Sequence, residues 1–145
     1  MDIPNKIVRT IADCSFCISY HPTRIEIDPK KLPFRLPDKR ATVPANPYND
    51  PKVFGLEVTK KFGNLPGFVI IPDQKFDRYG GRHSKGCGWY DRFLSIVPTE
   101  WVRIGICSKN EFSDTKLALQ KWDEVVDWVI VNDAGVYNFY ETNAR

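Results

Sequence analysis

Hydrophobic residues in the second half of the chain fall into short runs that alternate with polar, glycine-containing segments. The run 68–71 is wholly apolar and is stopped by Pro72, which is typical of a strand buried on both faces. Similar runs predict two further strands at 101–107 and 125–131, and the segment 136–140 could add a terminal edge strand.

Helical patterns lie between these runs. The segment 89–96 predicts a helix, and the segment 115–122 fits either a helical turn or a loop. Strands separated by helical segments favour parallel pairing through right-handed crossovers. The pattern therefore predicts an open α/β sheet, in which ligands bind beyond the carboxyl ends of the strands.

The first third of the chain has weaker patterns. The segment 7–11 fits one helical turn or a short strand, and the alternating segments 17–20 and 24–27 predict edge strands. Residues 28–52 are rich in proline and charge, so we expect an irregular, exposed connection or a lid there.

Composition places the chain among globular proteins. With 145 residues and 42% hydrophobic content, residues 1–145 are expected to form a single α/β domain around one core. The net charge of +3 is spread along the chain, so a nucleic-acid partner is not indicated. No apolar run is long enough for a membrane span and the first residues lack a signal-peptide core, which predicts a cytoplasmic protein without a membrane partner.

The four cysteines, Cys14, Cys17, Cys87 and Cys107, are expected to be reduced thiols, because a chain of this size with an apolar core needs no disulfide. Cys14 and Cys17 have the spacing of half a zinc site. No second pair follows, and only His21 is close in sequence, so we interpret both as small core residues.

The segment 80–94 combines glycines, cations and an acid between a strand pattern and a helical one. Glycines let backbone N–H groups approach an anion, and a following helix offers its positive end, so the segment predicts a phosphate site. Arg82 and Lys85 would pair with phosphate oxygens, and Gly86 and Gly88 would permit the close approach. Solvated loop cations and an ordinary turn are the alternative interpretation. Asp77 opens a strong turn signal and is interpreted as structural first.

The residue types in this segment and the spacing between them resemble those of a known protein family. The positions Ile70-Ile71-Pro72, Phe76-Asp77, Gly80, Arg82, Gly86 and Gly88-Trp89-Tyr90-Asp91-Arg92-Phe93-Leu94 resemble the signature of the 5-formyltetrahydrofolate cyclo-ligase family, in order and spacing. The segment 122–133 is similar to the closing segment of that family. The likeness covers about residues 65–137, while residues 1–64 are divergent and shorter than the corresponding part of the family.

The resemblance implies a Rossmann-like, three-layer α/β fold, mostly parallel and truncated relative to the family. It implies ATP with Mg²⁺, and cyclisation of the reduced folate 5-formyltetrahydrofolate to 5,10-methenyltetrahydrofolate. Arg82 and Lys85 would be catalytic, and Asp91 and Asp127 would hold the metal ion. The cofactor-binding positions would be Arg82, His83, Ser84, Lys85, Gly86, Cys87, Gly88, Trp89 and Tyr90, with Trp89 and Tyr90 as an aromatic wall.

Departures from the family keep other functions open. His83-Ser84 replace a Leu-Gly pair, and Cys87 stands where glycine or lysine is common, so side chains occupy positions where backbone should approach phosphate. These departures and the shortened first half also fit a catalytically lapsed nucleotide- or phosphate-binding relative. A partner chain or a second copy could complete the site. An RNA-binding role is a third alternative, although no RNP-like aromatic pair or clustered basic face supports it.

Overall fold

A six-stranded sheet runs through the computed structural model, which describes residues 4–44, 49–84 and 88–145. Its strands are β1 (Phe16–Tyr20), β2 (Lys39–Val43), β3 (Gly67–Pro72), β6 (Val102–Ser108), β8 (Trp128–Asp133) and β9 (Val136–Glu141), in the order β2-β1-β3-β6-β8-β9. Every neighbouring pair is parallel except the β8–β9 hairpin. The predicted α/β fold with a Rossmann-like, mostly parallel open sheet is therefore confirmed.

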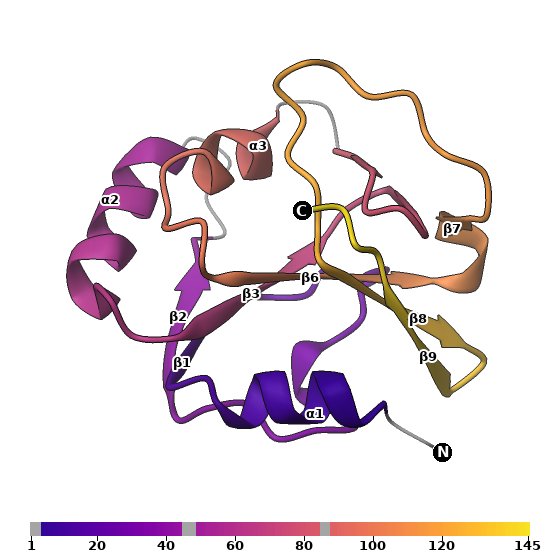
Figure 1. The fold of residues 1–145 in the computed structure, drawn as a ribbon, viewed down its shortest axis with the longest axis horizontal. Helices are drawn as coiled ribbons and strands as arrows, with labels where there is room; N and C mark the ends of the chain where they lie inside the picture. Colours follow the sequence, from indigo (N-terminus) through magenta and orange to yellow (C-terminus); the bar gives the residue numbers. More distant parts are fainter. Residues whose placement is uncertain (1–3, 45–48, 85–87) are drawn as a thin grey trace.

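Helices cover both faces of this sheet (Figure 1). Helices α2 (Pro51–Phe62) and α3 (Trp89–Leu94) lie on one face, and α1 (Asn5–Ala12) lies on the other. The alternation within β3 divides its side chains between two cores: Val69 and Ile71 pack with the α2–α3 side, and Phe68 and Ile70 pack with the α1 side. Burial on both faces is why this strand is a continuous apolar run in the sequence.

The order of the strands creates a switch point between β1 and β3. From β1 the chain moves outward to β2, returns through α2 to β3 on the other side of β1, and continues through α3 to β6. The connections after β1 and β3 therefore leave the sheet in opposite directions. In open α/β sheets this divergence opens a crevice beyond the carboxyl ends of the two strands, where ligands bind.

The predictions for residues 17–52 were partly wrong. Strand β1 is not an edge strand, because β2 and β3 pair with it on its two sides. Residues 24–27 form no strand, and the proline-rich region supplies both β2 and the start of α2. Pro51 is tolerated because it occupies the first turn of the helix, after the N-cap Asp50, whose carboxylate accepts from the backbone N–H of Lys52 at 2.9 Å.

Later boundaries also shift. Helix α3 ends at Leu94 and not at Ile96, because Pro98 has no N–H for the Leu94 carbonyl, which accepts instead from Arg103 Nη2 at 3.4 Å. Strand β8 begins at Trp128 and not at residue 125. The N–H of Val126 donates to Gly80 O at 3.0 Å, outside the strand ladder. Strand β9 is the predicted edge strand, and residues 115–122 form a loop.

A second, three-stranded sheet, which was not predicted from the sequence, is made of β4 (Lys75–Asp77), β5 (Arg82–His83) and β7 (Phe112–Ser113). Fully buried Asp77 holds the β4–β5 turn, since its Oδ1 accepts from the N–H groups of Tyr79 and Gly81 at 2.7 and 2.9 Å. This confirms the structural interpretation of Asp77. Two 3₁₀ turns, η1 (Pro29–Lys31) and η2 (Lys109–Glu111), complete the regular elements of the residues that the structure describes.

Cysteines 14, 17 and 107 are free thiols that pack with the cores, as expected. Burial raises the pKa of Cys17 and of Cys107 to about 12, so both thiols are protonated and poorly nucleophilic near neutral pH. Cys87 lies outside the described residues.

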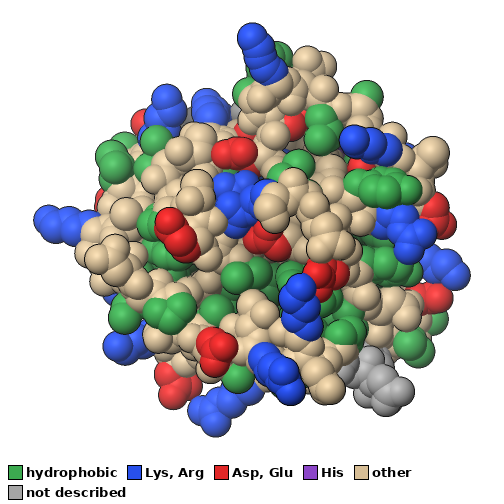
Figure 2. Space-filling model, viewed as in Figure 1, with side chains coloured by type: hydrophobic (Ala, Val, Ile, Leu, Met, Phe, Trp, Pro, Cys, Tyr) green, Lys and Arg blue, Asp and Glu red, His purple; other side chains and the backbone are tan. Residues whose placement is uncertain are grey.

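Charged side chains of both signs are present on the face of the molecule drawn in Figure 2. On the face drawn in Figure 2, cationic and acidic side chains are interspersed, and neither sign forms a continuous patch. Among the helices of the described part of the chain, none has the length and apolar content required to cross a bilayer.

Packing at Gly105 provides a test of the fold. A Cβ at this buried position of β6 would lie 2.3 Å from the ring of Phe76, which is fully buried. Gly105→Ala should therefore lower the free energy of unfolding by about 1–3 kcal/mol, measured by urea denaturation. Val136→Ala, on the exposed edge strand, should change it by about 0.5 kcal/mol or less. Equal effects of the two substitutions would contradict the described packing of β6.

Candidate functional site

Two cavities lie beside predicted site residues. The larger of these two lies at the switch point between β1 and β3 and has a volume of about 870 Å³. Residues 23–27, which follow β1, form one wall, and residues 72–75, which follow β3, form the opposite wall. Ile106 and Cys107 of β6 contribute to the lining, together with Glu111 and His83. The carboxyl ends of three neighbouring parallel strands therefore surround the cavity, as the topology requires.

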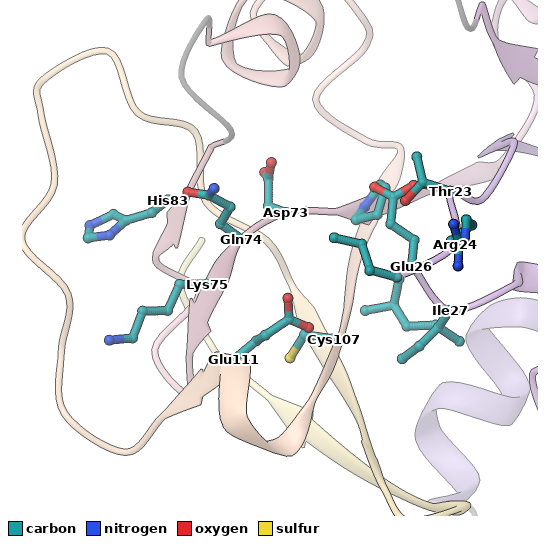
Figure 3. A pocket seen from close by; sticks show the side chains of 13 residues that line it. Thr23, Arg24, Glu26, Ile27, Asp73, Gln74, Lys75, His83, Cys107 and Glu111 are labelled. Carbon is teal, nitrogen blue, oxygen red and sulfur yellow. The ribbon is translucent and has the colours of Figure 1, made fainter.

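Polar side chains face each other across this cavity (Figure 3). Asp73 and Gln74 project from the segment after β3, and Thr23, Arg24 and Glu26 lie opposite them. Asp73 has a side chain that is only 3% exposed. The cavity thus combines apolar walls with a buried carboxylate and with the cationic side chains of Arg24 and Lys75, which suits a flat polar ring better than a purely anionic group.

A smaller cavity of about 360 Å³ lies beside the predicted phosphate segment. One side is formed by β5 and the start of α3, through Arg82 to Ser84, Gly88 and Asp91, and the other side is formed by Gln120, Trp122 and Asp123 of the long loop before β8. His83 lines both cavities. Two ligands bound in the two cavities would therefore approach each other at this residue.

The loop between β7 and β8, residues 114–127, is fixed over the smaller cavity by hydrogen bonds along its length. The N–H of Leu117 donates to Asp77 Oδ2 at 2.7 Å, His83 Nε2 donates to Ala118 O at 2.9 Å, and the N–H of Glu124 donates to Asp91 Oδ1 at 2.9 Å. The loop passes close to α3 and β5 in Figure 1. These anchors make it a defined wall although it contains no regular element.

The guanidinium of Arg82 connects the two cavities through the protein interior. Its Nη1 lies 3.2 Å from Asp73 Oδ2, and its Nη2 lies 3.0 Å from Asp91 Oδ1. The side chain of Arg82 is 0% exposed. These ion pairs are close in distance, but the guanidinium nitrogens make no aligned hydrogen bond within the described part of the chain. We call this arrangement the Asp73–Arg82–Asp91 bridge.

The bridge changes the expected role of Arg82. Two carboxylates surround one guanidinium, so the three groups together carry a formal charge of about −1. A bidentate contact between Arg82 and phosphate, as expected from the sequence, is therefore not the arrangement that the structure holds. The guanidinium of Arg82 is instead paired with two carboxylates, that of Asp73 after β3 and that of Asp91 in α3.

Asp91 is a buried acid at the edge of the smaller cavity. Burial raises the pKa of its carboxyl, and Asp123 raises it further, whereas the Glu124 N–H and Arg82 lower it. The expectation of a metal-binding residue here rests on one carboxylate, whose Oδ1 already accepts from the N–H of Glu124 and forms an ion pair with Arg82. The position of Asp91 on the cavity lining remains compatible with a ligand contact.

Asp127 lies in a different network. Its Oδ1 accepts from Arg145 Nε at 2.8 Å, and its Oδ2 accepts from the N–H of Arg103 at 2.8 Å and from Arg145 Nη2 at 3.0 Å. Among the described residues, no group of three or more His, Cys, Asp or Glu side chains is arranged to hold a metal ion. The predicted pairing of Asp91 with Asp127 around magnesium does not fit this geometry, because Arg103 and Arg145 use both oxygens of Asp127.

Only some of the remaining predicted site residues line the smaller cavity. His83, Ser84 and Gly88 line the smaller cavity, whereas Lys85, Gly86 and Cys87 lie outside the described residues. Trp89 packs on Phe93 with ring centroids 5.2 Å apart, and Tyr90 contacts Trp89 edge-on with ring centroids 5.1 Å apart.

Neither Trp89 nor Tyr90 lines the two cavities, so the expected aromatic wall is instead part of the core between α2 and α3. Helix α3 has only six residues, which weakens the helix-end contribution expected at the phosphate site.

Several lining residues were not singled out from the sequence. Asp73 follows the apolar strand and Pro72 directly, which is the position where ligand-binding side chains occur in open α/β sheets, so the pattern could have indicated it. Trp122 and Asp123 gave no comparable local signal, because their placement depends on the anchors of the loop.

No protein-family model matches the chain, and no curated protein matches it. The resemblance to the cyclo-ligase family therefore remains a prediction from the sequence motif.

The bridge predicts a pH-dependent effect of Arg82→Met. Removing one partner of a buried ion pair should cost about 3–5 kcal/mol near neutral pH, because Asp73 and Asp91 stay buried without their cation. Burial already raises the pKa of Asp91, and the substitution raises it further. When the pKa of an acid is higher in the folded than in the unfolded state, the free energy of unfolding of the protein falls as the pH rises above the unfolded-state pKa of about 3.9. It increases again as the pH falls.

Urea denaturation of wild type and of Arg82→Met at about pH 7 and about pH 4.5 gives the free energy of unfolding of each protein. The difference in this free energy between the two proteins should be smaller at the lower pH. Arg78→Met removes the exposed pair with Asp114 and should cost about 0.5 kcal/mol or less at both pH values. A pH-independent loss for Arg82→Met would exclude the bridge.

Proposed function

We propose that this protein is an ATP-dependent enzyme that binds a reduced folate in the larger cavity and ATP in the smaller cavity, and that it cyclises 5-formyltetrahydrofolate as the motif implies. The observation that carries the proposal is that two cavities meet at His83, beyond the carboxyl ends of β1, β3 and β6. A reaction between two small molecules needs such adjacent sites. Holding both reactants in position supplies much of the rate enhancement in such a reaction.

The larger cavity has properties that suit the folate. A pterin ring is flat and carries amide and amino N–H donors, and the buried carboxylate of Asp73 would accept from them. Ile27, Pro72 and Ile106 offer apolar surface to the ring faces. Arg24 and Lys75 at the margin would pair with the carboxylates of the folate tail.

In the proposed reaction the formyl oxygen forms a bond to the γ-phosphorus of ATP, and the bond from that phosphorus to the β–γ bridging oxygen breaks, releasing ADP. N10 then attacks the activated carbon and loses its proton, the new C–N bond forms, and phosphate leaves. The described residues would contribute by holding the two reactants at His83 and by excluding water between them. Arg82 would act as a positioning residue, because its guanidinium fixes Asp73 in one cavity and Asp91 in the other.

Magnesium is usually held by one or two carboxylates together with substrate phosphates and waters. Asp91 is the predicted metal residue that lines the nucleotide cavity, whereas Asp127 is held by Arg103 and Arg145. We therefore route no step of the reaction through the metal ion. A cytoplasmic location is part of the proposal, since the substrates are small metabolites.

A second candidate is a catalytically lapsed relative that binds a nucleotide or another phosphate-containing ligand without turnover. The observation that favours it is the charge around Arg82, whose two carboxylate partners leave no positive charge for a transferred phosphoryl group. The two candidates differ in turnover, and both require ligand binding.

Binding of ATP is tested by calorimetry on the full chain with and without magnesium. Lys85→Ala should weaken ATP binding by about 10- to 150-fold, the effect of removing a charged hydrogen bond of about 1.5–3 kcal/mol. The control is Lys109→Ala, since Lys109 pairs with Asp133 on the surface, and its ATP affinity should equal that of wild type. No detectable ATP binding by wild type would reject both candidates.

Turnover is tested by the absorbance of the methenyl product after mixing the protein with ATP and 5-formyltetrahydrofolate. Wild type should form the product, and Asp91→Asn should lower kcat at least about 100-fold, because it removes the carboxylate that anchors both Arg82 and the 114–127 loop. Asp114→Asn, in an exposed pair, is the matched control and should retain activity. ATP binding without product formation would contradict the enzyme and favour the lapsed relative.

A further inference from the structure

Of the four tryptophans in the chain, Trp122 has the most exposed side chain. Trp101 and Trp128 are buried and Trp89 is half-buried in the core, whereas 68% of the surface of Trp122 is exposed. An exposed indole on a monomer surface is unfavourable in water, since a large apolar ring gains free energy from burial.

The exposure of Trp122 does not result from a loose segment. Hydrogen bonds hold the backbone on both sides of it: Gln120 N donates to Asp123 Oδ2 at 2.7 Å, Asp123 N donates to Gln120 O at 3.0 Å, and Glu124 N donates to Asp91 Oδ1 at 2.9 Å. Trp122 therefore sits on a tight turn that is tied to α3. The fold presents this indole at the edge of the smaller cavity.

The cavity beside Trp122 has an acidic lining. Asp91 and Asp123 both line this cavity, and the charge of Arg82, which also lines it, is shared with Asp73. Phosphate oxygens would be repelled by these carboxylates. Groups that donate hydrogen bonds, such as the amino group of a nucleobase or the hydroxyls of a ribose, would be accepted by them.

We propose that Trp122 is the stacking residue for the base of the bound nucleotide, with the donor groups of the nucleoside directed to Asp91 and Asp123. This inference rests on the proposed function, because it assigns one part of the ATP ligand to one wall of the same cavity. It places the nucleoside at the acidic turn, and the triphosphate then extends toward His83, the residue shared with the larger cavity. Stacking of a base on an aromatic side chain tolerates any base, so specificity for adenine is not required of Trp122.

The test compares ligands with and without a base on the full-length protein. Calorimetry with ATP, GTP and inorganic tripolyphosphate is carried out on wild type, Trp122→Ala and Trp122→Phe. Trp122→Ala should weaken ATP and GTP about 5- to 150-fold, the range for loss of one base-stacking contact. Trp122→Phe should retain most of the affinity, and tripolyphosphate should bind wild type and both variants equally.

Tyr79→Ala is the matched control. Tyr79 is another exposed aromatic residue, 49% accessible, and it does not line the smaller cavity, so its removal should leave all affinities unchanged. As a second readout, ATP should quench the tryptophan emission of wild type, and this quenching should be lost in Trp122→Phe.

Each other outcome overturns the inference. If wild type binds ATP and Trp122→Ala binds it equally well, the stacking role is wrong while the proposed function stands. If Trp122→Ala alters only the oligomeric state in gel filtration, a second copy of the chain covers the indole instead. If wild type binds neither ATP nor GTP, the proposed function fails, and the stacking role fails with it.

Discussion

The buried pairing of Arg82 with Asp73 and Asp91 is the interaction on which both cavities depend. Asp73 directly follows the central strand β3 and lines the larger cavity, and Asp91 lies in α3 and lines the smaller one. A guanidinium without solvent exposure needs counter-charges, and two carboxylates without exposure need a cation. The three residues therefore fix the distance between the end of β3, the β4–β5 hairpin and α3.

The strand order determines where these residues meet. Because the strands after β1 and after β3 are added on opposite sides of this parallel pair, the segments after the two strands separate and leave the larger cavity between them. The small β5-β4-β7 sheet then carries Arg82 and His83 to the side of that cavity. Asp77 extends the same arrangement, since it caps the β4–β5 turn and also accepts from the N–H of Leu117, which begins the loop wall of the smaller cavity. Local turn chemistry thus positions a loop that is distant in sequence.

The sequence predicted the elements whose burial leaves a clear hydrophobic pattern. Strands β3 and β6 were found because a strand covered on both faces is apolar throughout. Strand β2 was missed because it is an edge strand with exposed Lys39 and Arg40, and its neighbouring prolines suggested an irregular segment. Helix α2 has apolar residues at helical spacing, Phe54, Val58 and Phe62, but Gly55 in its interior argues locally against a helix.

For the site, the sequence pointed to a segment of which several residues line the smaller cavity, and the structure pairs Arg82 and Asp127 with protein groups. The loop pattern led to Arg82, His83, Ser84, Gly88 and Asp91, which line the smaller cavity. It could not show that Arg82 would be neutralised by two acids, because their approach depends on the register of β4 with β5 and on the packing of α3. Charge counting along the chain gives no information on such pairing, and the assignment of Asp127 to a metal was made without its Arg145 contact.

Two ligands should bind in two cavities that have His83 as a common lining residue. Hydrogen–deuterium exchange on the full chain measures this binding directly, with ATP alone, 5-formyltetrahydrofolate alone and both together. We expect ATP to protect residues 88–94 and 117–124, the folate to protect residues 23–27 and 72–75, and both ligands to protect residues 82–84. Protection of one common set of segments by both ligands, or of none of these segments by either, would contradict this expectation.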